Sequence, residues 1–159
     1  MKELTFLVEG YRVGCRWDAS EVEPVIRALQ LPNFTLCRQS PDAVFTVSKA
    51  GGRYRVELNE QTRSNCELAQ VGTNLAREIQ LEVATHAPDT VFVHAGVVRY
   101  REGLVVIPGK SFSGKSTLVA ELCKAGAGYY SDEYAVVTED GRVRAWPRPL
   151  TLRTEDYQT

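Results

Sequence analysis

Eight consecutive residues constrain the fold of this chain more than any other feature of its sequence. They match the pattern GxxxxGK(S/T) at every fixed position and are Gly109, Lys110, Ser111, Phe112, Ser113, Gly114, Lys115 and Ser116. An apolar, β-branched run, Leu104 to Pro108, precedes the segment, and apolar residues at helical spacing, Leu118 and Leu122, follow it. A buried strand that passes through a glycine-containing turn into a helix is therefore predicted here.

This arrangement has a physical purpose. Gly109 and Gly114 let the backbone turn so that successive N–H groups face inward, and a helix beginning near Lys115 adds its positive end. The concavity suits a triphosphate: Lys115 would reach the β and γ phosphates, Ser116 would ligate Mg²⁺, and Thr117 would complete the cradle. The sequence predicts that residues 109–117 bind ATP or GTP with Mg²⁺, and it does not indicate which base is preferred.

An acidic pair, Asp132-Glu133, follows the predicted strand after the loop helix. Because ligand sites of α/β sheets form at the carboxyl ends of strands, the pair is expected to face the same crevice as the loop. One carboxylate could hold the metal and the other could take a proton from an attacking hydroxyl. The alternative is a solvated turn, but the matched loop favours the site.

Two further residues are ambiguous. His94 interrupts the apolar run Val91 to Val98, where it is either a hydrogen-bonded core residue or a catalytic group, and the Ala95-Gly96 that follows would allow close approach of backbone or ligand. Arg148, between two prolines, either contacts phosphate or lies in a fixed bend. The residues alone leave both alternatives open.

Taken in order, these segments resemble the catalytic domain of HPr kinase/phosphorylase and its smaller relatives. The resemblance covers about residues 90 to 153 and rests on His94-Ala95-Gly96, on the strand and loop from Leu104 to Ser116, on Tyr130 to Glu133, and on Pro147 to Leu152. It implies a P-loop mixed sheet of the HPr kinase and phosphoenolpyruvate carboxykinase type. The implied reaction moves the γ-phosphoryl group of a nucleotide to a serine hydroxyl of a protein or peptide.

The resemblance also implies roles for individual residues. Asp132 would be the general base, His94 would orient it, Glu133 would support the metal, and Lys115 would act on the phosphates. Glu133 stands where the bifunctional enzymes have Asp, and their later signature segment is absent, which argues against the reverse phosphorolysis. The relatives continue past the Pro-Arg-Pro segment, so the chain is expected to be a truncated piece or to complete its sheet in a homo-oligomer.

The sequence predicts an α/β class, α+β overall, in two regions. Residues 1–88 form a small α+β region ending in a long helix, and residues 89–159 form the nucleotide-binding region. In the first region we expect a hairpin over 4–15, a helix over 21–29 capped by Ser20, a hairpin over 44–58, and the long helix beginning at Ser64 or Asn65. In the second we expect buried strands over 91–98 and 104–108, a helix that Ala125-Gly126 ends, and a hairpin over 129–146.

Composition excludes some classes of partner. The formal net charge is −1, which gives no footprint for nucleic acid or an anionic membrane. The apolar runs are too short to cross a bilayer, and the amino end does not read as a signal peptide, so a cytoplasmic protein is predicted. Four scattered cysteines, Cys15, Cys37, Cys66 and Cys123, indicate free thiols.

Three functions remain from this reasoning. The leading hypothesis is a serine kinase acting on a protein or peptide. A kinase of a small-molecule hydroxyl uses the same chemistry, and a nucleotide-binding subunit or sensor without turnover uses the loop alone. Asp132 separates the kinases from the sensor, because only a kinase needs a base there.

Overall fold

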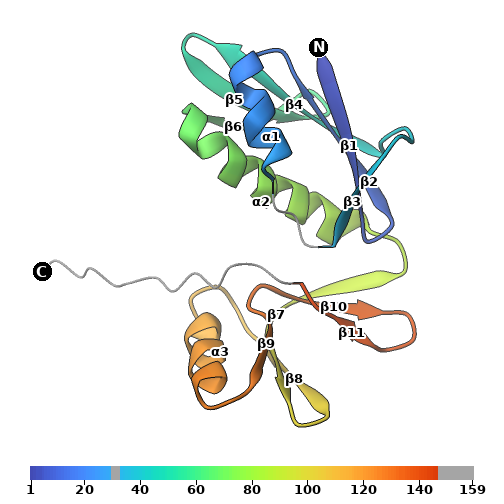
Figure 1. Cartoon of the computed structure of the whole chain (residues 1–159), viewed down its shortest axis with the longest axis vertical. Coiled ribbons are helices and arrows are strands. Elements are labelled where there is room, and N and C mark those ends of the chain that lie inside the picture. The colour runs from blue at the N-terminus through green and yellow to red at the C-terminus, as the bar shows by residue number, and fades with distance from the viewer. Residues whose placement is uncertain (30–32, 147–159) are drawn as a thin grey trace, which may run out of the picture. The chain divides into compact units, whose positions relative to one another are not determined.

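The computed structural model describes residues 1–29 and 33–146 of the chain. It is a mixed α+β structure that is mostly sheet, with three α-helices in the described ranges. The chain divides into two compact units, Met1–Pro88 and Asp89–Thr159 (Figure 1). Each unit has its own sheet.

The first unit is built on a six-stranded sheet in the order β3-β1-β2-β4-β5-β6. The pair β2 and β4 is parallel, and the other neighbours are antiparallel. The strands are β1 (Lys2–Val8), β2 (Tyr11–Trp17), β3 (Phe34–Cys37), β4 (Ala43–Ala50), β5 (Arg53–Leu58) and β6 (Gln61–Cys66).

Both hairpins predicted for this unit are confirmed. β1 and β2 are joined by Glu9 and Gly10, with φ of 47° and 81°, and β4 and β5 by Gly51 and Gly52, with φ of 58° and 79°. Two consecutive residues of positive φ form the two-residue turn whose twist matches that of antiparallel strands.

Two helices, α1 (Glu23–Arg27) and α2 (Leu68–His86), cover one face of the sheet (Figure 1). The buried positions of α2 recur every four residues at Val71, Leu75, Ile79 and Val83, as in an amphipathic helix, and the predicted long helix is present. The helix contacts β2, β5 and β6, and alternate residues of β4 and β5 are also buried, namely Phe45, Val47, Val56 and Leu58.

The predicted start of α2 is wrong. Ser64 and Asn65 lie in β6, and α2 begins at Leu68, after Glu67 as the N-cap residue. The backbone N–H of Glu67 donates to Oε1 of Gln70 at 3.2 Å, and the Gln70 N–H donates to the Glu67 carbonyl at 2.9 Å. Ser and Asn are common N-cap residues, so the sequence favoured them, whereas the cap here is formed by Glu67 together with Gln70.

The predicted cap of the first helix is also wrong. Ser20 lies inside a 3₁₀ turn, Ser20–Val22, whose N-cap is Ala19, and its hydroxyl makes no cap hydrogen bond. The α-helix itself is only five residues long and begins at Glu23, with Pro24 in its first turn as expected.

The second unit is organised around one long strand, β7 (Thr90–Tyr100). On one side β7 pairs with β8 (Gly103–Pro108), and on the other side with β9 (Gly128–Ser131) and β10 (Tyr134–Thr138). A two-residue strand, β11 (Val143–Arg144), pairs with the outer edge of β10. All these pairings are antiparallel, so β9 and β10 form one interrupted strand beside β7.

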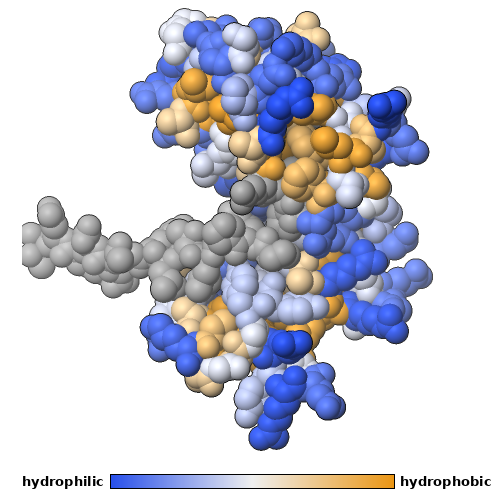
Figure 2. All heavy atoms as spheres, in the orientation of Figure 1, coloured by the Kyte–Doolittle hydropathy of each residue, from blue (hydrophilic) through white to orange (hydrophobic). Residues whose placement is uncertain are grey.

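The prediction of two buried strands here is half right. Ala95 to Val98 of β7 are buried, whereas β8 is an edge strand with Val105 44% and Val106 37% exposed. Hydrophobic residues alone did not distinguish a central strand from an edge. The tip of the hairpin of β7 and β8 is hydrophilic (Figure 2).

The helix α3 (Lys115–Lys124) packs on β7 and ends as predicted, with Ala125 as its C-cap and Gly126 at a φ of 100°. The opposite face of the sheet carries a small core of Ala95, Val97 and Ala135. The predicted last hairpin is present but interrupted, because Asp132 and Glu133 separate β9 from β10.

The segment Pro147 to Leu152, with Arg148, lies outside the described residues. None of the helices in the described ranges combines the length and apolar character needed to cross a membrane. Cys15, Cys37, Cys66 and Cys123 are all free thiols.

Candidate phosphate-binding site

The segment between β8 and α3 forms an open turn. Gly114 is the N-cap of α3 in the left-handed conformation, with a φ of 83°, and its carbonyl accepts the N–H of Leu118 at 2.9 Å. The N–H of Ser113 donates to the carbonyl of Lys110 at 3.2 Å. The residues from Lys110 to Gly114 are exposed, so the turn is accessible to a ligand.

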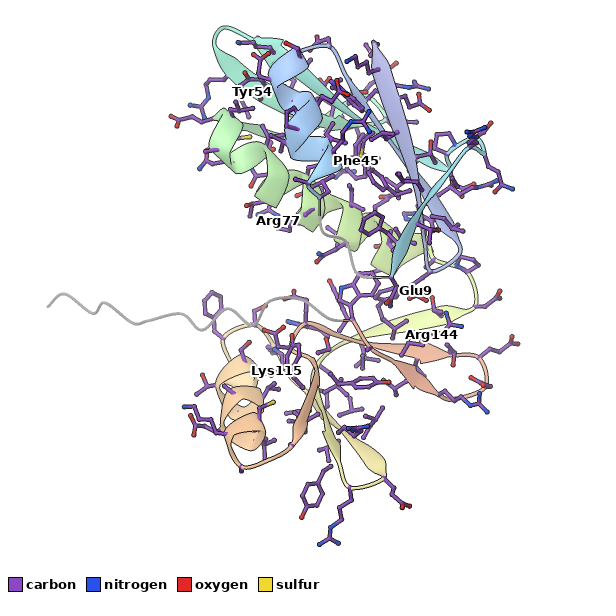
Figure 3. All side chains as sticks on the ribbon, in the orientation of Figure 1. Glu9, Phe45, Tyr54, Arg77, Lys115 and Arg144 are labelled. Atoms are coloured by element: carbon purple, nitrogen blue, oxygen red, sulfur yellow. The ribbon has the colours of Figure 1, made fainter. Side chains whose placement is uncertain are left out.

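Lys115 holds this turn together. Its side chain is buried, and Nζ donates to the carbonyls of Gly109, at 2.8 Å, and Lys110, at 2.7 Å. Figure 3 shows Lys115 at the end of α3 that adjoins the turn. An ammonium group has three N–H donors, so after these two bonds it can still donate one to a phosphate oxygen. Ser116 and Thr117 follow in the first turn of the helix.

One peptide group connects the turn to the acidic pair. The carbonyl of His94 accepts the N–H of Gly109 at 3.3 Å, and the N–H of Ala95 donates to the carbonyl of Glu133 at 3.2 Å. These two groups belong to the same peptide unit of β7 and point in opposite directions. Since neighbouring strands lie roughly 4.8 Å apart, the backbones of Gly109 and Glu133 are separated by about 10 Å.

Gly96, the next residue of β7, lets α3 approach the sheet. A Cβ atom on Gly96 would lie 2.6 Å from Cγ2 of Val119 and 3.8 Å from the carbonyl oxygen of Lys115. The predicted close approach at Ala95-Gly96 is therefore made by the loop helix. This close contact places the start of α3 on the face of β7 that a side chain at position 96 would occupy.

A buried serine shapes the acidic turn. Oγ of Ser131, which is fully buried, accepts the N–H groups of Glu133, at 3.3 Å, and Tyr134, at 3.1 Å. This side-chain turn interrupts the strand and leaves Asp132 and Glu133 half-buried between β9 and β10. The hydroxyl of Tyr129 donates to Oδ1 of Asp132 at 2.8 Å and so orients that carboxylate.

Sequence reasoning did not identify Tyr129 or the role of Ser131. A serine directly before the acidic pair is a signal for such a turn. No sequence pattern indicates Tyr129, because its contact with Asp132 depends on the irregular register between β9 and β7.

His94 lies on β7 between the phosphate loop and the acidic turn. It is half-buried and pairs with Tyr134 of β10, and the two rings have their centroids 6.1 Å apart. In the described part of the chain no hydrogen bond joins the His94 side chain to Asp132. The backbone of His94 thus belongs to the site, and the role of its ring in orienting Asp132 remains a prediction.

The reason given from sequence for the proximity of the acidic pair is wrong in one respect. It assumed an α/β sheet with its ligand site at the carboxyl ends of the strands, whereas this sheet is antiparallel throughout the described residues of the second unit. The acidic turn and the loop are neighbours because both flank His94-Ala95 on β7.

The donors at this site fit a hard cation bridged by phosphate. The described residues contain no group of three or more His, Cys, Asp or Glu side chains that could hold a metal by themselves. Mg²⁺ is commonly bound through one or two protein oxygens together with substrate phosphates, and the hydroxyl of Ser116 and a carboxylate of the acidic turn are oxygen donors of that kind.

Comparisons with models of protein families, with curated proteins and with solved structures found no match to this chain. The geometry of the site and the resemblance noted in its sequence are therefore the grounds for a functional proposal.

Proposed function

We propose that this chain is a serine kinase of the HPr kinase type, which transfers the γ-phosphoryl group of ATP or GTP to a serine hydroxyl of a protein or peptide. One observation carries the proposal. A single peptide group, between His94 and Ala95, hydrogen-bonds the first residue of the phosphate loop on one side and the acidic turn on the other.

In the proposed reaction, the chain binds the triphosphate and positions the acceptor. Backbone amides of the loop, the start of α3 and the Lys115 ammonium bind the β and γ phosphates. Ser116 and Glu133, together with the phosphates, would hold Mg²⁺, and the bound ion would supply charge neutralisation. Positioning and electrostatic stabilisation account for most of the catalysis in reactions of this class.

Asp132 supplies the proton acceptor. The acceptor serine oxygen forms a bond to the γ phosphorus, the bond from that phosphorus to the bridging β-γ oxygen breaks, and the nucleoside diphosphate leaves with the electron pair. The serine proton passes to the Asp132 carboxylate. The Tyr129 hydroxyl holds Oδ1 of Asp132, and His94 lies on the adjacent strand to orient the carboxylate.

Calorimetric titration with Mg²⁺ and ATP or GTP tests the loop. The unaltered chain is expected to bind, and Lys115→Ala is expected to bind at least about tenfold more weakly, because a charge-assisted contact to phosphate is lost. Lys124→Ala, at an exposed lysine of the opposite end of α3, is the control and is expected to change affinity by less than about threefold. Unchanged affinity in Lys115→Ala would reject the loop as the phosphate site.

Asp132→Asn tests the chemistry. This variant is expected to keep its nucleotide affinity and to lose phosphoryl transfer by about 100-fold or more, measured by mass spectrometry of serine-containing candidate acceptors and of the chain itself. Retained nucleotide binding with no phosphorylated product in the unaltered chain would favour a nucleotide sensor instead. Phosphorylation of a metabolite but of no peptide would move the acceptor to the small-molecule class.

The proposal includes a homo-oligomer in the cytoplasm. Four free cysteines suit a reducing compartment. Self-association is supported by the edge strand β8, which exposes Val105 and Val106 and has no charged residue between Leu104 and Pro108 to prevent pairing.

Light scattering after size-exclusion chromatography tests the self-association. Val105→Lys places a charge on the exposed edge and is expected to shift the mass toward that of one chain, 17.7 kDa. Leu36→Lys, at an exposed apolar residue of β3 in the first unit, is the control and is expected to leave the mass unchanged. A single-chain mass for the unaltered protein at all concentrations would contradict the oligomer.

A further inference from the structure

One residue of the phosphate loop has a backbone conformation that its side chain disfavours. Phe112 has a φ of 66°, in the left-handed region, where a Cβ atom crowds the backbone. Among the non-glycine residues of positive φ in the described ranges, Phe112 alone is apolar; the others are polar or charged: Glu9, Asn33, Asn59, Glu60, Asp89 and Arg101. Glycine would adopt the same conformation without this strain.

The Phe112 side chain is also unusually exposed. Its exposed fraction is 88%, the highest among the large hydrophobic residues in the described part of the chain. A ring exposed to this extent is accessible to a ligand. Backbone strain of this kind is concentrated at active sites and ligand-binding segments, where the surrounding structure maintains it.

The position of Phe112 in the loop indicates which ligand. It lies within the turn closed by the N–H of Ser113 and the carbonyl of Lys110, and that carbonyl also accepts from the Lys115 ammonium at 2.7 Å. The other exposed aromatic residue described in the second unit, Tyr100, is the last residue of β7, at the tip of the hairpin of β7 and β8, beside Arg101. Phe112 is therefore the exposed aromatic ring adjoining the proposed phosphate cradle.

We propose that Phe112 is a base-binding residue that stacks on the nucleobase of the bound triphosphate. The inference rests on the proposed nucleotide binding by the loop. The loop binds the phosphates of that ligand, and Phe112 binds its base. A flat aromatic ring binds any base through its π face and reads none of its hydrogen-bonding edges. ATP and GTP should consequently bind with affinities within about threefold of each other, and both should bind more tightly than a phosphate chain with no base.

The test compares ATP, GTP and inorganic tripolyphosphate, each with Mg²⁺, by calorimetric titration of the full chain and three variants. Phe112→Leu and Phe112→Gly are expected to bind ATP and GTP about tenfold more weakly and tripolyphosphate with unchanged affinity. Phe112→Tyr keeps the aromatic face and is expected to bind all three like the unaltered chain.

A second readout distinguishes stacking from a structural role. Phe112→Gly relieves the left-handed strain, so the thermal midpoint of the nucleotide-free protein is expected to rise while its ATP affinity falls. A residue needed only for the shape of the loop would lower both the thermal midpoint and the affinity for tripolyphosphate when replaced.

Three results would overturn the inference: unchanged ATP affinity in Phe112→Leu, an equal loss of ATP and tripolyphosphate affinity, or ATP binding no tighter than tripolyphosphate in the unaltered chain. Unchanged nucleotide affinity with a slower transfer to a protein acceptor would place the ring on the acceptor side instead. Failure of the unaltered chain to bind tripolyphosphate would reject the phosphate loop itself, a different result from failure of the base contact alone.

Discussion

Gly96 has a larger role than its size suggests, because it sets the distance between the sheet and the loop helix. A Cβ atom at this position would lie 2.6 Å from Cγ2 of Val119, which is buried and cannot move without shifting α3. We expect Gly96→Ala to lower the free energy of unfolding by about 1 to 3 kcal/mol and to weaken Mg·ATP binding. Urea denaturation and calorimetric titration measure the two effects.

The control for this substitution is Gly128→Ala. The three nearest atoms to a Cβ atom on Gly128 would all belong to Arg99, at 3.5 to 3.9 Å, which are ordinary contacts. If the two variants lost equal stability and equal affinity, the proposed contact of α3 with β7 would not be what positions the loop.

Glu21 carries a pH dependence that is confined to the first unit. Lys49 Nζ, at 2.6 Å, and the Tyr54 hydroxyl, at 2.7 Å, donate to Oε1 of Glu21, and these bonds lower the pKa of that carboxyl from 4.5 to about 2. A pKa that is lowered on folding stabilises the folded state above pH 4.5, and this contribution disappears as the pH falls toward 2.

We therefore expect Glu21→Gln to be less stable than the unaltered chain at pH 7 and equally stable near pH 2. Urea denaturation of both proteins at several pH values measures the difference. A difference in stability that persists unchanged at pH 2 would show that Glu21 acts through packing and not through its charge.

At the scale of elements, the N-terminal cap of α2 can be tested by substitution. The side chain of Gln70 accepts the Glu67 N–H, which otherwise has no partner within the helix. We expect Gln70→Ala to lower the free energy of unfolding by about 1 kcal/mol, measured by denaturant titration. Thr73→Ala, at an exposed position inside the same helix, should not lower it, since alanine favours helix more than threonine does.

Elements whose own residues favour one backbone conformation could be predicted from the sequence. Elements that depend on hydrogen bonds to neighbouring strands could not. The turns at Glu9-Gly10 and Gly51-Gly52 and the helix stop at Gly126 each require positive φ, which glycine adopts easily. The edge strand β6, by contrast, has the polar sequence QTRSNC, and only its hydrogen bonds to β5 make it a strand.

The same distinction holds at the candidate site. The loop from Gly109 to Ser116 could be located from its spacing, because every fixed position has a local conformational reason. The hydrogen bond from Tyr129 to Asp132 could not, since it depends on how β9 and β10 pair with β7. The edge position of β8 was missed for a related reason: it depends on which strands lie beside it.

At the scale of the whole molecule, the division at Pro88 predicts that the first unit folds by itself. Residues 1–88 contain a complete sheet, two helices and a core that includes Trp17, Phe45 and Leu75, all buried. A chain of residues 1–88 is expected to unfold cooperatively and to give dispersed amide signals in NMR spectra. Signals typical of an unfolded chain would contradict this prediction.

The peptide group between His94 and Ala95 has a consequence for how this sequence can vary. Since it joins the loop to the acidic turn directly, the length of chain between them, including the connection after Gly126, does not set their spacing. Extra residues inserted after Gly126 should leave the two segments adjacent, whereas deleting one residue from Val91 to Val93 would slide His94 out of step with both neighbouring strands. Natural length variation is thus expected in that connection and not in β7.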